Sequence, residues 1–405
     1  MPCSFMYYKY FHMSKTFCIL PWTHFFHNPS GKITPCCAAS DQTQHDYGNV
    51  KDFDTYTDII NQDSFNTLRR NMLDEVETDV CNYCYQAESH GGQSFRTSKN
   101  SMLDQMISMD EITNMTNPDG SVNNFKMRYW DVRFSNVCNL ACRMCGPDYS
   151  HTLAKEMEIK FNGSYVVNAH NTDNFEEMIA KYGPLDKLYD IYFAGGEVMF
   201  QKEHWQMLDY LVKIGKTDVM LMYNTNLTKL DYDGFKLLDY IPKFKDVTFT
   251  VSLDGTGDLL EYIRWGSRWD DIVRNLDTLK KIPNVNIRIV HVTMHYNVLD
   301  LMKTIDFFFS NRYITDAKRM DLQMANEPHN HVGALPEELK QEAIRRIQSS
   351  NWYTLLDDLR PKLDAIIDAM RTVNYEFPKE HIWNMDQRRG CNIANVVSEF
   401  KTYMD

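Results

Sequence analysis

Apolar and polar residues alternate in short runs between residues 127 and 324, and this period of two is typical of half-buried β-strands. The predicted strands are MRYWDVRF (127–134), LYDIYF (188–193), DVMLMY (218–223), DVTFTVSL (246–253), VNIRIVHV (285–292) and RMDLQM (319–324). Six strands that alternate with helical patterns indicate right-handed βαβ units and a parallel sheet. We therefore predict an α/β fold, either an open sheet or a partial barrel that stops short of the eight units that close one.

The helical segments between the strands have apolar residues three or four positions apart. They are predicted at 173–183, 201–215 and 269–282. The first begins with the capping pattern Asp173…Glu176 and ends at Gly183. In folds of this kind ligands bind at the carboxyl ends of the strands, so residues that directly follow a strand are the first candidates for a functional site.

The pattern changes outside residues 128–330. Residues 1–98 contain short apolar runs interrupted by NPSG, and they are rich in cysteine. Residues 99–127 are rich in Met, Asn, Asp and Ser, and we expect a linker or a loosely held surface segment. Residues 331–405 predict a helical extension with one helix starting near Pro336. A second helix there is marked by the apolar residues Leu363, Ile366, Ile367 and Met370.

Composition narrows the possible functions. The chain has 405 residues, 43% of them hydrophobic, which is enough for a sizeable core. Its net charge of −12 argues against nucleic acid as the main partner. No run approaches 18 uncharged apolar residues, and the N-terminus lacks the apolar core of a signal peptide. Ten cysteines without a secretory signal therefore predict a cytoplasmic protein whose thiols serve metals or catalysis.

Three of these cysteines stand in CNLACRMCG (138–146), directly after the first predicted strand. Thiolates suit iron–sulfur clusters and zinc. In a four-iron cluster, Cys138, Cys142 and Cys145 would anchor three irons and leave the fourth with an open coordination site. A fully ligated cluster could not chelate a small molecule in this way.

CX3CX2C on a loop that leaves a strand, ahead of a βα array, resembles the radical S-adenosylmethionine (SAM) superfamily. The resemblance implies a partial (β/α)6 barrel, a SAM-binding 4Fe-4S cluster and SAM itself. Further positions match the family's cofactor-binding residues in sequence: Gly195, Gly196, Glu197, Asn224, Asn226, Ser252, Asp254 and Arg264.

The resemblance also implies roles for these residues. The Gly-Gly-Glu motif would hold the SAM ammonium group, Ser252 would contact SAM, and Arg264 would bind its carboxylate with a bidentate fork. Asn224 and Asn226 fit either a ligand role or the preference of Asn for turns. Two local departures from the family are Val198, where Pro is common, and Met144, where an aromatic residue is common. Methionine fills the second position adequately.

The N-terminal cysteines resemble the auxiliary-cluster modules called SPASM and twitch. WTHFFHNPSGKITPCC predicts a hairpin that brings Cys36 back near Cys18, and Cys81 with Cys84 would complete a four-thiolate site. The number of cysteines favours the single-cluster twitch form, placed before the barrel instead of after it. Cys37 remains an alternative to Cys36, and a structural zinc remains an alternative to the second Fe–S cluster.

By this resemblance the chain is an enzyme that cleaves SAM reductively to a 5′-deoxyadenosyl radical and abstracts hydrogen from a substrate carbon. A peptide or protein substrate is expected, with electrons from a low-potential donor such as flavodoxin or ferredoxin. The alternatives are a dehydrogenase of a small sugar-like molecule and, from another class, a non-catalytic Fe–S or zinc scaffold. The intact motifs argue against the scaffold.

Three further residues, His291, His295 and Cys391, are expected to have structural or minor roles. The chain has no HExxH pattern, so His291 and His295 after the fifth strand are expected to line a pocket or form a turn. Cys391 is expected to be a small buried residue. A sharper hypothesis makes it a hydrogen-atom donor to a substrate radical, as the resemblance to peptide-epimerising members implies.

Overall fold

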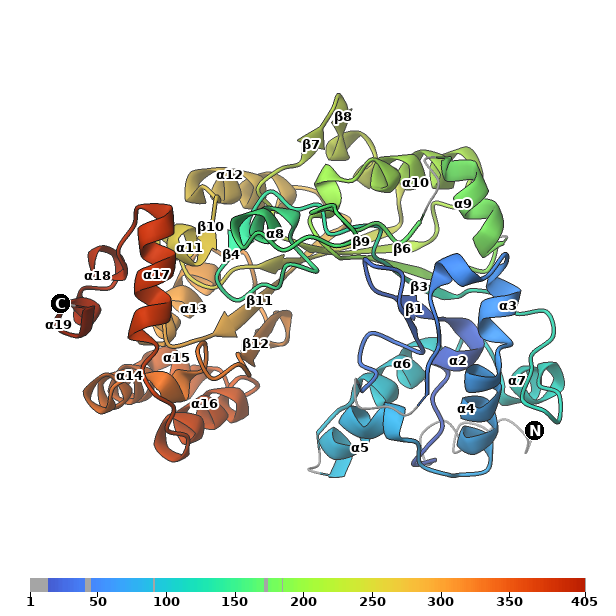
Figure 1. Cartoon of the computed structure of the whole chain (residues 1–405), viewed down its shortest axis with the longest axis horizontal. Coiled ribbons are helices and arrows are strands. Elements are labelled where there is room, and N and C mark those ends of the chain that lie inside the picture. Colours follow the sequence, from blue (N-terminus) through green and yellow to red (C-terminus); the bar gives the residue numbers. More distant parts are fainter. Residues whose placement is uncertain (1–13, 41–44, 90–91, 171–173, 184, 405) are drawn as a thin grey trace. The chain divides into compact units, whose positions relative to one another are not determined.

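The computed structural model of the chain describes residues 14–40, 45–89, 92–170, 174–183 and 185–404. The chain forms two compact units, coloured along the sequence in Figure 1. Unit 1 comprises residues 1–137 and 161–221, and unit 2 comprises residues 138–160 and 222–405.

All six predicted strands form: β3 (Tyr129–Val132), β5 (Asp190–Phe193), β6 (Met220–Thr225), β9 (Asp246–Ser252), β11 (Val285–Thr293) and β12 (Met320–Met324). Their order in the sheet is β12-β11-β9-β6-β5-β3. The pairs β3–β5, β9–β11 and β11–β12 are parallel. Strands of this sheet that follow one another along the chain are therefore neighbours in the sheet, which confirms the predicted α/β fold with successive βαβ units.

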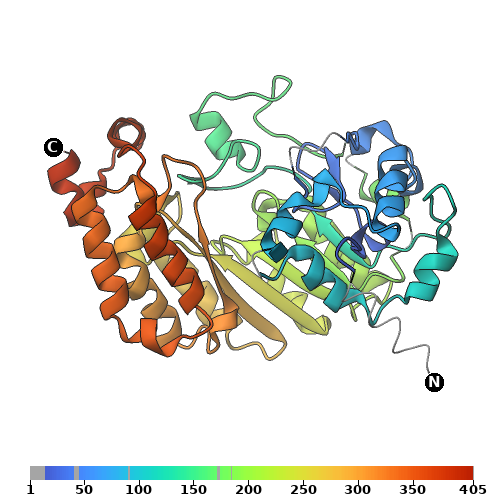
Figure 2. The same ribbon diagram turned by 90° about the horizontal axis from the view of Figure 1, so that it is seen from below.

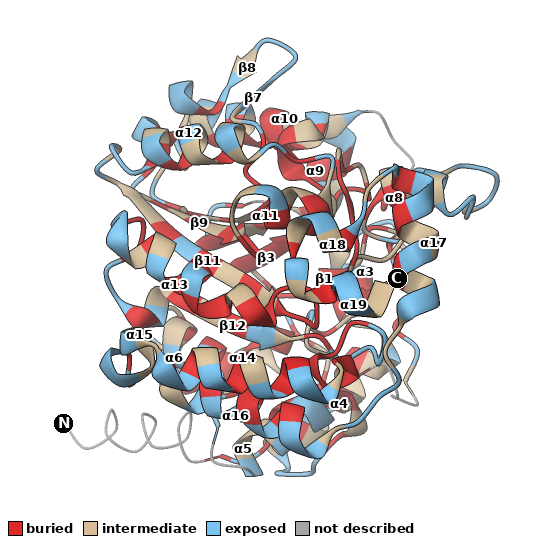
Figure 3. Ribbon diagram, turned by 90° about the vertical axis from the view of Figure 1, so that its left-hand side faces the viewer, coloured by how far each residue is buried: buried red, intermediate tan, exposed pale blue. Residues whose placement is uncertain are grey.

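In unit 2 the buried strand faces meet amphipathic helices. Alternate residues of β9 are buried, and Phe249 of this strand stacks on Tyr223 with ring centroids 4.8 Å apart. Helix α12 (Trp269–Leu279) buries Ile272, Leu276 and Leu279, which lie on one helix face. Helices α11 (Gly257–Ile263) and α13 (Leu301–Ser310) also bury apolar residues. Figure 3 shows the resulting division of the helices into buried and exposed faces.

The C-terminal part of unit 2 is helical, as predicted. It consists of α14 (Glu337–Ser349), α15 (Asn351–Leu355), α16 (Arg360–Thr372), α17 (Lys379–Arg389), α18 (Ile393–Val396) and α19 (Lys401–Met404). The four apolar residues predicted to mark α16 are all buried in it. Pro336 is the N-cap residue of α14. The orange and red helices at this end of the chain are seen side by side in Figure 2.

Unit 1 contains the predicted N-terminal hairpin. Strands β1 (Phe26–His27) and β2 (Ile33–Thr34) pair antiparallel. Gly31 in the connecting turn has φ +86°, and a Cβ there would lie 2.6 Å from Asn49 Oδ1, so this position needs glycine. The α-helices of the described part of this unit are α2 (Leu20–Thr23), α3 (Tyr56–Ile60), α4 (Asp63–Leu73), α5 (Asn82–Ser89), α6 (Phe95–Leu103), α7 (Met109–Met115), α9 (Phe175–Tyr182) and α10 (Lys202–Lys213).

Two details of unit 1 differ from the sequence expectation. Asn174 caps α9 by accepting hydrogen bonds from the amides of Glu176 and Glu177, whereas Asp173 lies outside the described residues. The segment 99–127 contains the end of α6 and all of α7, and it buries Ile107, Ile112 and other apolar side chains. The apolar residues of this segment are therefore packed against the rest of unit 1. They were not recognised in the sequence because they are too far apart to form a regular pattern.

Arg69 of α4 is fully buried and ties unit 1 together through backbone carbonyls. Its guanidinium donates to the carbonyl oxygens of Pro21 at 2.9 Å, Ile60 at 2.5 Å and Gly120 at 2.7 Å. Burial lowers the pKa of Arg69 to about 9. One side chain thus donates hydrogen bonds to carbonyl oxygens of three separate segments. Without Arg69 these buried oxygens would lose a donor.

We predict that Arg69→Met destabilises the protein by at least about 3 kcal/mol, because a buried acceptor without a partner costs about 1–3 kcal/mol. Urea denaturation followed by tryptophan fluorescence measures the change. Arg70→Met is the control, since Arg70 is an exposed neighbour on the same helix and should change stability by less than about 0.5 kcal/mol. Equal losses in the two variants would contradict the anchoring role of Arg69.

Candidate functional site

The three-cysteine loop (138–146) begins unit 2 and is held by a short antiparallel pairing. Strand β4 (Ala141–Cys142) pairs with β10 (Arg264–Trp265), so that Cys142 lies opposite Arg264. The N-terminus of α8 (His151–Glu156) secures the other side. There Ser150 Oγ donates to the carbonyl of Leu140 at 2.6 Å, and the amide of Cys138 donates to His151 Nδ1 at 3.1 Å.

The predicted polar residues at the strand ends gather near this loop within unit 2. Asn226 Nδ2 donates to Asn139 Oδ1 at 3.0 Å and lies 4.0 Å from Cys138 Sγ. Asn139 in turn donates to Thr228 Oγ1 at 3.0 Å. Ser252 Oγ donates to Asn224 Oδ1 at 3.2 Å. Asn139 and Thr228 were not singled out from the sequence, because nothing in their local pattern distinguishes them from ordinary turn residues.

Asp254 and Arg264, both predicted as cofactor-binding residues, form a buried ion pair. Arg264 Nη2 lies 2.7 Å from Asp254 Oδ2, and Arg264 Nη1 lies 3.8 Å from Cys142 Sγ. Asp254 Oδ1 accepts a hydrogen bond from the amide of Val292 at 2.7 Å. Burial alone would lower the pKa of Arg264, but Asp254 and Cys142 raise it. A permanent positive charge therefore lies beside the middle cysteine.

The chemistry of the loop fits an iron–sulfur cluster. Cys138 and Cys142 are buried, and none of the described cysteines forms a disulfide. Burial and the neighbouring Cys142 raise the pKa of Cys145 to about 12, which shows that the thiols oppose one another's ionisation. In the described part of the chain no three or more His, Cys, Asp or Glu side chains are arranged as a preformed metal site. The loop suits an iron–sulfur cluster because its thiols lie together and their thiolate forms need a nearby cation such as iron.

Met144 packs against the cluster formed by Cys138, Leu140 and Cys142. This agrees with the expectation that a flexible thioether fills the position where an aromatic residue is common.

The Gly-Gly-Glu motif lies in unit 1 after β5 and packs against the chain that leaves β3. The amide of Gly196 donates to the carbonyl of Ser135 at 3.1 Å, and that of Glu197 donates to the carbonyl of Val137 at 2.7 Å. A Cβ on Gly196 would lie only 2.2 Å from the Val137 oxygen, so the position tolerates glycine alone. Gly195 has φ +111°. Glu197 is buried at the start of a 3₁₀ turn that contains Val198.

The four N-terminal thiols lie close to one another in unit 1. Burial raises the pKa of Cys18, and the nearby Cys81 and Cys84 raise it further. Burial likewise raises the pKa of Cys36, with contributions from Cys37, Cys18, Cys81 and Cys84. The pKa of Cys37 is raised to about 12 by burial and then by Asp131, and the other three cysteines are not among its main neighbours. Cys36 therefore remains the predicted fourth ligand, and Cys37 remains the alternative.

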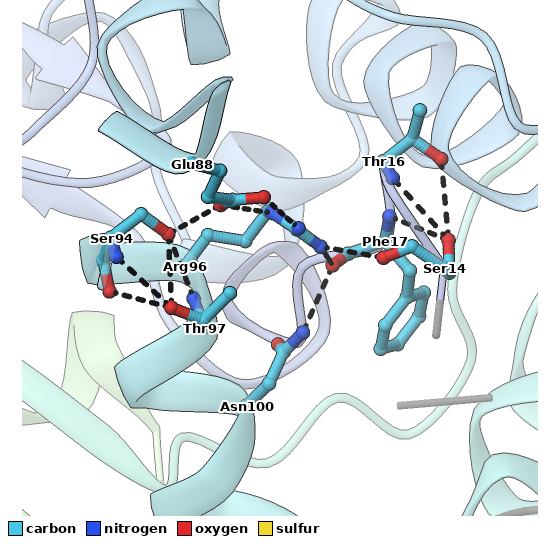
Figure 4. Close-up of polar contacts among 8 residues, drawn as sticks. All are labelled: Ser14, Thr16, Phe17, Glu88, Ser94, Arg96, Thr97 and Asn100. Carbon is cyan, nitrogen blue, oxygen red and sulfur yellow. Dashed lines mark hydrogen bonds and ion pairs between the residues drawn. The ribbon is translucent and has the colours of Figure 1, made fainter. Parts of the chain in front are cut away.

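A polar network fixes the backbone around Cys18 (Figure 4). Arg96 Nη1 donates to the carbonyl of Phe17 at 2.6 Å and to that of Ser14 at 3.1 Å. Arg96 also forms an ion pair with Glu88, on the helix that carries Cys84. Asn100 Nδ2 donates to the Phe17 carbonyl at 3.0 Å, while Asn100 Oδ1 accepts from the amide of Ile19. The segments that carry two of the cysteines are thereby joined.

Two family models match the chain. Residues 132–308 match the radical SAM superfamily, and residues 18–85 match the iron–sulfur cluster-binding domain known as SPASM. The first match contains the three-cysteine loop, and the second contains Cys18, Cys36, Cys37, Cys81 and Cys84. Residues 132–308 therefore form a radical SAM domain. Its auxiliary-cluster domain precedes the radical SAM domain, as predicted.

Solved structures of radical SAM proteins resemble the chain distantly. A histidine-tagged form of anSMEcpe with bound AdoMet is 15% identical, with 66% of this chain and 65% of that chain covered and a TM-score of 0.40. Native anSMEcpe with AdoMet and the Cp18Cys peptide is 16% identical (58% and 61% covered, TM-score 0.38). Streptococcus suis SuiB bound to S-adenosylmethionine is 11% identical (72% and 62% covered, TM-score 0.36). The chain thus spans less than two thirds of each of these proteins. The comparison with curated proteins gave no match.

Membership in the superfamily implies a 4Fe-4S cluster and SAM, and the SPASM match implies auxiliary iron–sulfur chemistry. The thiols described above remain the predicted ligands for both. Among the described residues, no helix is long and apolar enough to cross a membrane.

His295 is a buried residue of the radical SAM domain just after β11. In the described structure neither of its ring nitrogens has a hydrogen-bond partner, and its ring stacks on Tyr296 with centroids 3.9 Å apart. Burial lowers the pKa of His295 to about 3. Below pH 6.5 the unfolded chain therefore binds a proton that the folded chain excludes, and stability falls as the pH falls toward 3.

We predict that His295 alone contributes about 2 kcal/mol of destabilisation at pH 5, since 1.5 pH units below 6.5 correspond to about 1.36 kcal/mol each. His295→Phe keeps the stacking and should reduce the loss of stability between pH 7 and pH 5 by this amount in urea denaturation. Tyr296→Phe is the control, because it keeps both His295 and the stacked ring and should leave the pH dependence nearly unchanged. An unaltered pH dependence in His295→Phe would refute the assignment.

We predict that Cys81→Ala with Cys84→Ala halves the iron of anaerobically prepared protein, because the loop at 138–146 retains its own cluster. Iron, sulfide and zinc analysis checks this. Cys37→Ala is the matched control and should keep the full iron content. If zinc disappears from the double variant while iron stays constant, the N-terminal site is structural zinc.

Proposed function

We propose that this radical SAM enzyme modifies a peptide or protein by abstracting hydrogen from a substrate carbon. The observation that carries the proposal is the family match over residues 132–308 together with the grouping of Cys142, Asp254 and Arg264 in unit 2. When bound, the cluster and SAM supply one-electron reductive cleavage of SAM and hydrogen abstraction. A low-potential protein such as flavodoxin or ferredoxin would deliver the electron.

The residues of the chain would bind and orient the cofactors. Cys138, Cys142 and Cys145 would hold the cluster and leave one iron open. Arg264 offsets the negative charge of the Cys142 thiolate, and Asp254 fixes the direction of its guanidinium. The free side of this guanidinium is then a ready donor for a carboxylate such as that of SAM. Ordering the donor before binding reduces the entropic cost of binding.

The polar residues at the ends of β6 and β9 would orient the rest of SAM. Ser252 and Asn224 share a hydrogen bond, so their remaining donor and acceptor capacity points to a ligand with hydroxyl or amino groups. The Gly-Gly-Glu motif would offer backbone groups and a buried carboxylate to the SAM ammonium, as in the family.

A peptide or protein substrate is supported by the SPASM match, since members with auxiliary clusters mostly act on such substrates. Unit 2 also contains a cavity of about 790 Å³, a size that takes several amino-acid side chains. It is lined by aromatic rings and histidines, among them Phe377, His381 and Trp383, and by the charged residues Glu376, Lys379 and Glu380. This mixed lining suits an amphipathic peptide. A reducing cytoplasm would keep all the thiols available for cluster assembly.

We predict that anaerobic protein with dithionite and SAM releases 5′-deoxyadenosine and methionine without added substrate. Cys142→Ala should reduce the release at least about hundredfold, because two thiolates do not retain the cluster of an open-site loop. Chromatography of the products measures both. Cys37→Ala is the control with the full rate. Unchanged release from folded Cys142→Ala would disprove the assignment of the loop.

A further inference from the structure

Arg143, which directly follows the second cysteine of the motif, points away from solvent and into unit 2. Its side chain has no exposed surface. The guanidinium lies over the ring of Tyr262 at 3.6 Å, and Nε donates to the Tyr262 carbonyl at 3.0 Å. The amide of Arg143 donates to the carbonyl of Ile263 at 2.9 Å. An arginine between two cysteine ligands is thus held by the end of α11.

The counterion of Arg143 comes from the C-terminal helix α17. Arg143 Nη2 donates to Asp386 Oδ1 at 2.5 Å, across 243 residues of sequence. Asp386 is also buried, and both of its oxygens are occupied. Oδ1 additionally accepts from Tyr262 Oη at 2.9 Å, and Oδ2 accepts from the amide of Ile393 at 2.9 Å. Asp386 is thereby fully satisfied, whereas Arg143 Nη1 is buried without a hydrogen-bond partner among the described residues. Several hydrogen bonds to one carboxylate favour a single geometry of the buried pair.

The C-terminal end of α17 makes a second contact with the loop at 138–146. Arg389 Nη2 donates to the carbonyl of Ala141 at 2.8 Å, and Arg389 Nε donates to Glu156 at 3.0 Å. Gly390 then ends the helix in the left-handed region at φ +63°. This turn places Cys391 Sγ 3.3 Å from Arg143 Nη2. Cys391 is therefore only partly buried and belongs to a polar network, which corrects the expectation of a small buried apolar residue.

We propose that residues 379–393, which we name the C-terminal brace, are part of the cluster site, and that Asp386 is the positioning residue that fixes Arg143 and the loop around it. The brace lies outside the matched family region of 132–308. This inference rests on the proposed function. Because Asp386 neutralises Arg143, this residue of the loop adds no uncompensated charge, and the reduced cluster gains no extra stabilisation from that side.

The test compares wild type with Asp386→Asn in full-length protein, anaerobically reconstituted with iron and sulfide. Three quantities are measured: hydrogen exchange of the amides at 138–146, the midpoint potential of the loop cluster, and SAM binding seen as a change in its EPR spectrum. We expect exchange about tenfold faster, a more positive potential because Arg143 loses its counterion, and SAM binding about tenfold weaker. A merely structural role would not shift the potential in this direction.

Two further variants keep the test decisive. Tyr262→Phe removes one hydrogen bond to Asp386 and should change the three quantities in the same direction by a smaller factor. Arg388→Gln changes an exposed neighbour on α17 and should match wild type. The proposal is overturned if folded Asp386→Asn matches wild type, or if Asp386→Asn unfolds while Tyr262→Phe leaves exchange and potential unchanged. Wild-type protein without a loop cluster would instead refute the proposed function, while the exchange measurement would still report on the brace.

Discussion

Buried arginines fix the three-cysteine loop, and the functional face of unit 2 depends on them. The loop has only one short pairing, between β4 and β10, so backbone hydrogen bonds alone leave most of it without regular support. Arg264, Arg143 and Arg389 supply the rest, each by donating to a carbonyl, a carboxylate or a sulfur of a different segment. A guanidinium suits this task because its planar donors satisfy several acceptors at fixed angles. Arg264 also lies beside the Cys142 sulfur, where a cluster thiolate brings negative charge.

In unit 1, too, buried polar side chains hold irregular backbone in place. Arg96 and Asn100 hold the carbonyl of Phe17, next to Cys18, and Arg69 collects carbonyls from three segments. The N-terminal domain has a two-stranded hairpin and short helices, so its described part lacks a large sheet that could absorb these backbone groups. Short elements leave many carbonyls unpaired, and a few buried cations satisfy them. The cysteine positions are thereby defined by side-chain donors as well as by the hairpin.

The predictability of the fold follows from the range of the interactions involved. The six strands were predictable because each has an alternating or apolar pattern of its own, and α12, α14 and α16 because their apolar residues repeat on one face. The segment at 99–127 was less predictable, since its buried residues are sparse and their partners lie elsewhere in the chain. The cysteine motifs were visible because ligand spacing within one loop is a local property. The role of Asp386 was invisible, because an aspartate on a polar helix face is ordinary until its partner is known.

The sequence by itself determined the α/β class, the six strands, the two sets of clustered cysteines and the resemblance to the radical SAM family, since all of these are carried by residues close together in the chain. Tertiary structure alone decided which residues support the ligands. It joined Arg264 to Asp254 beside Cys142 and brought Asp386 to Arg143. The physical reason is that burial makes an unpaired charge costly, so a buried arginine must find its counterion wherever the packing of the chain brings one.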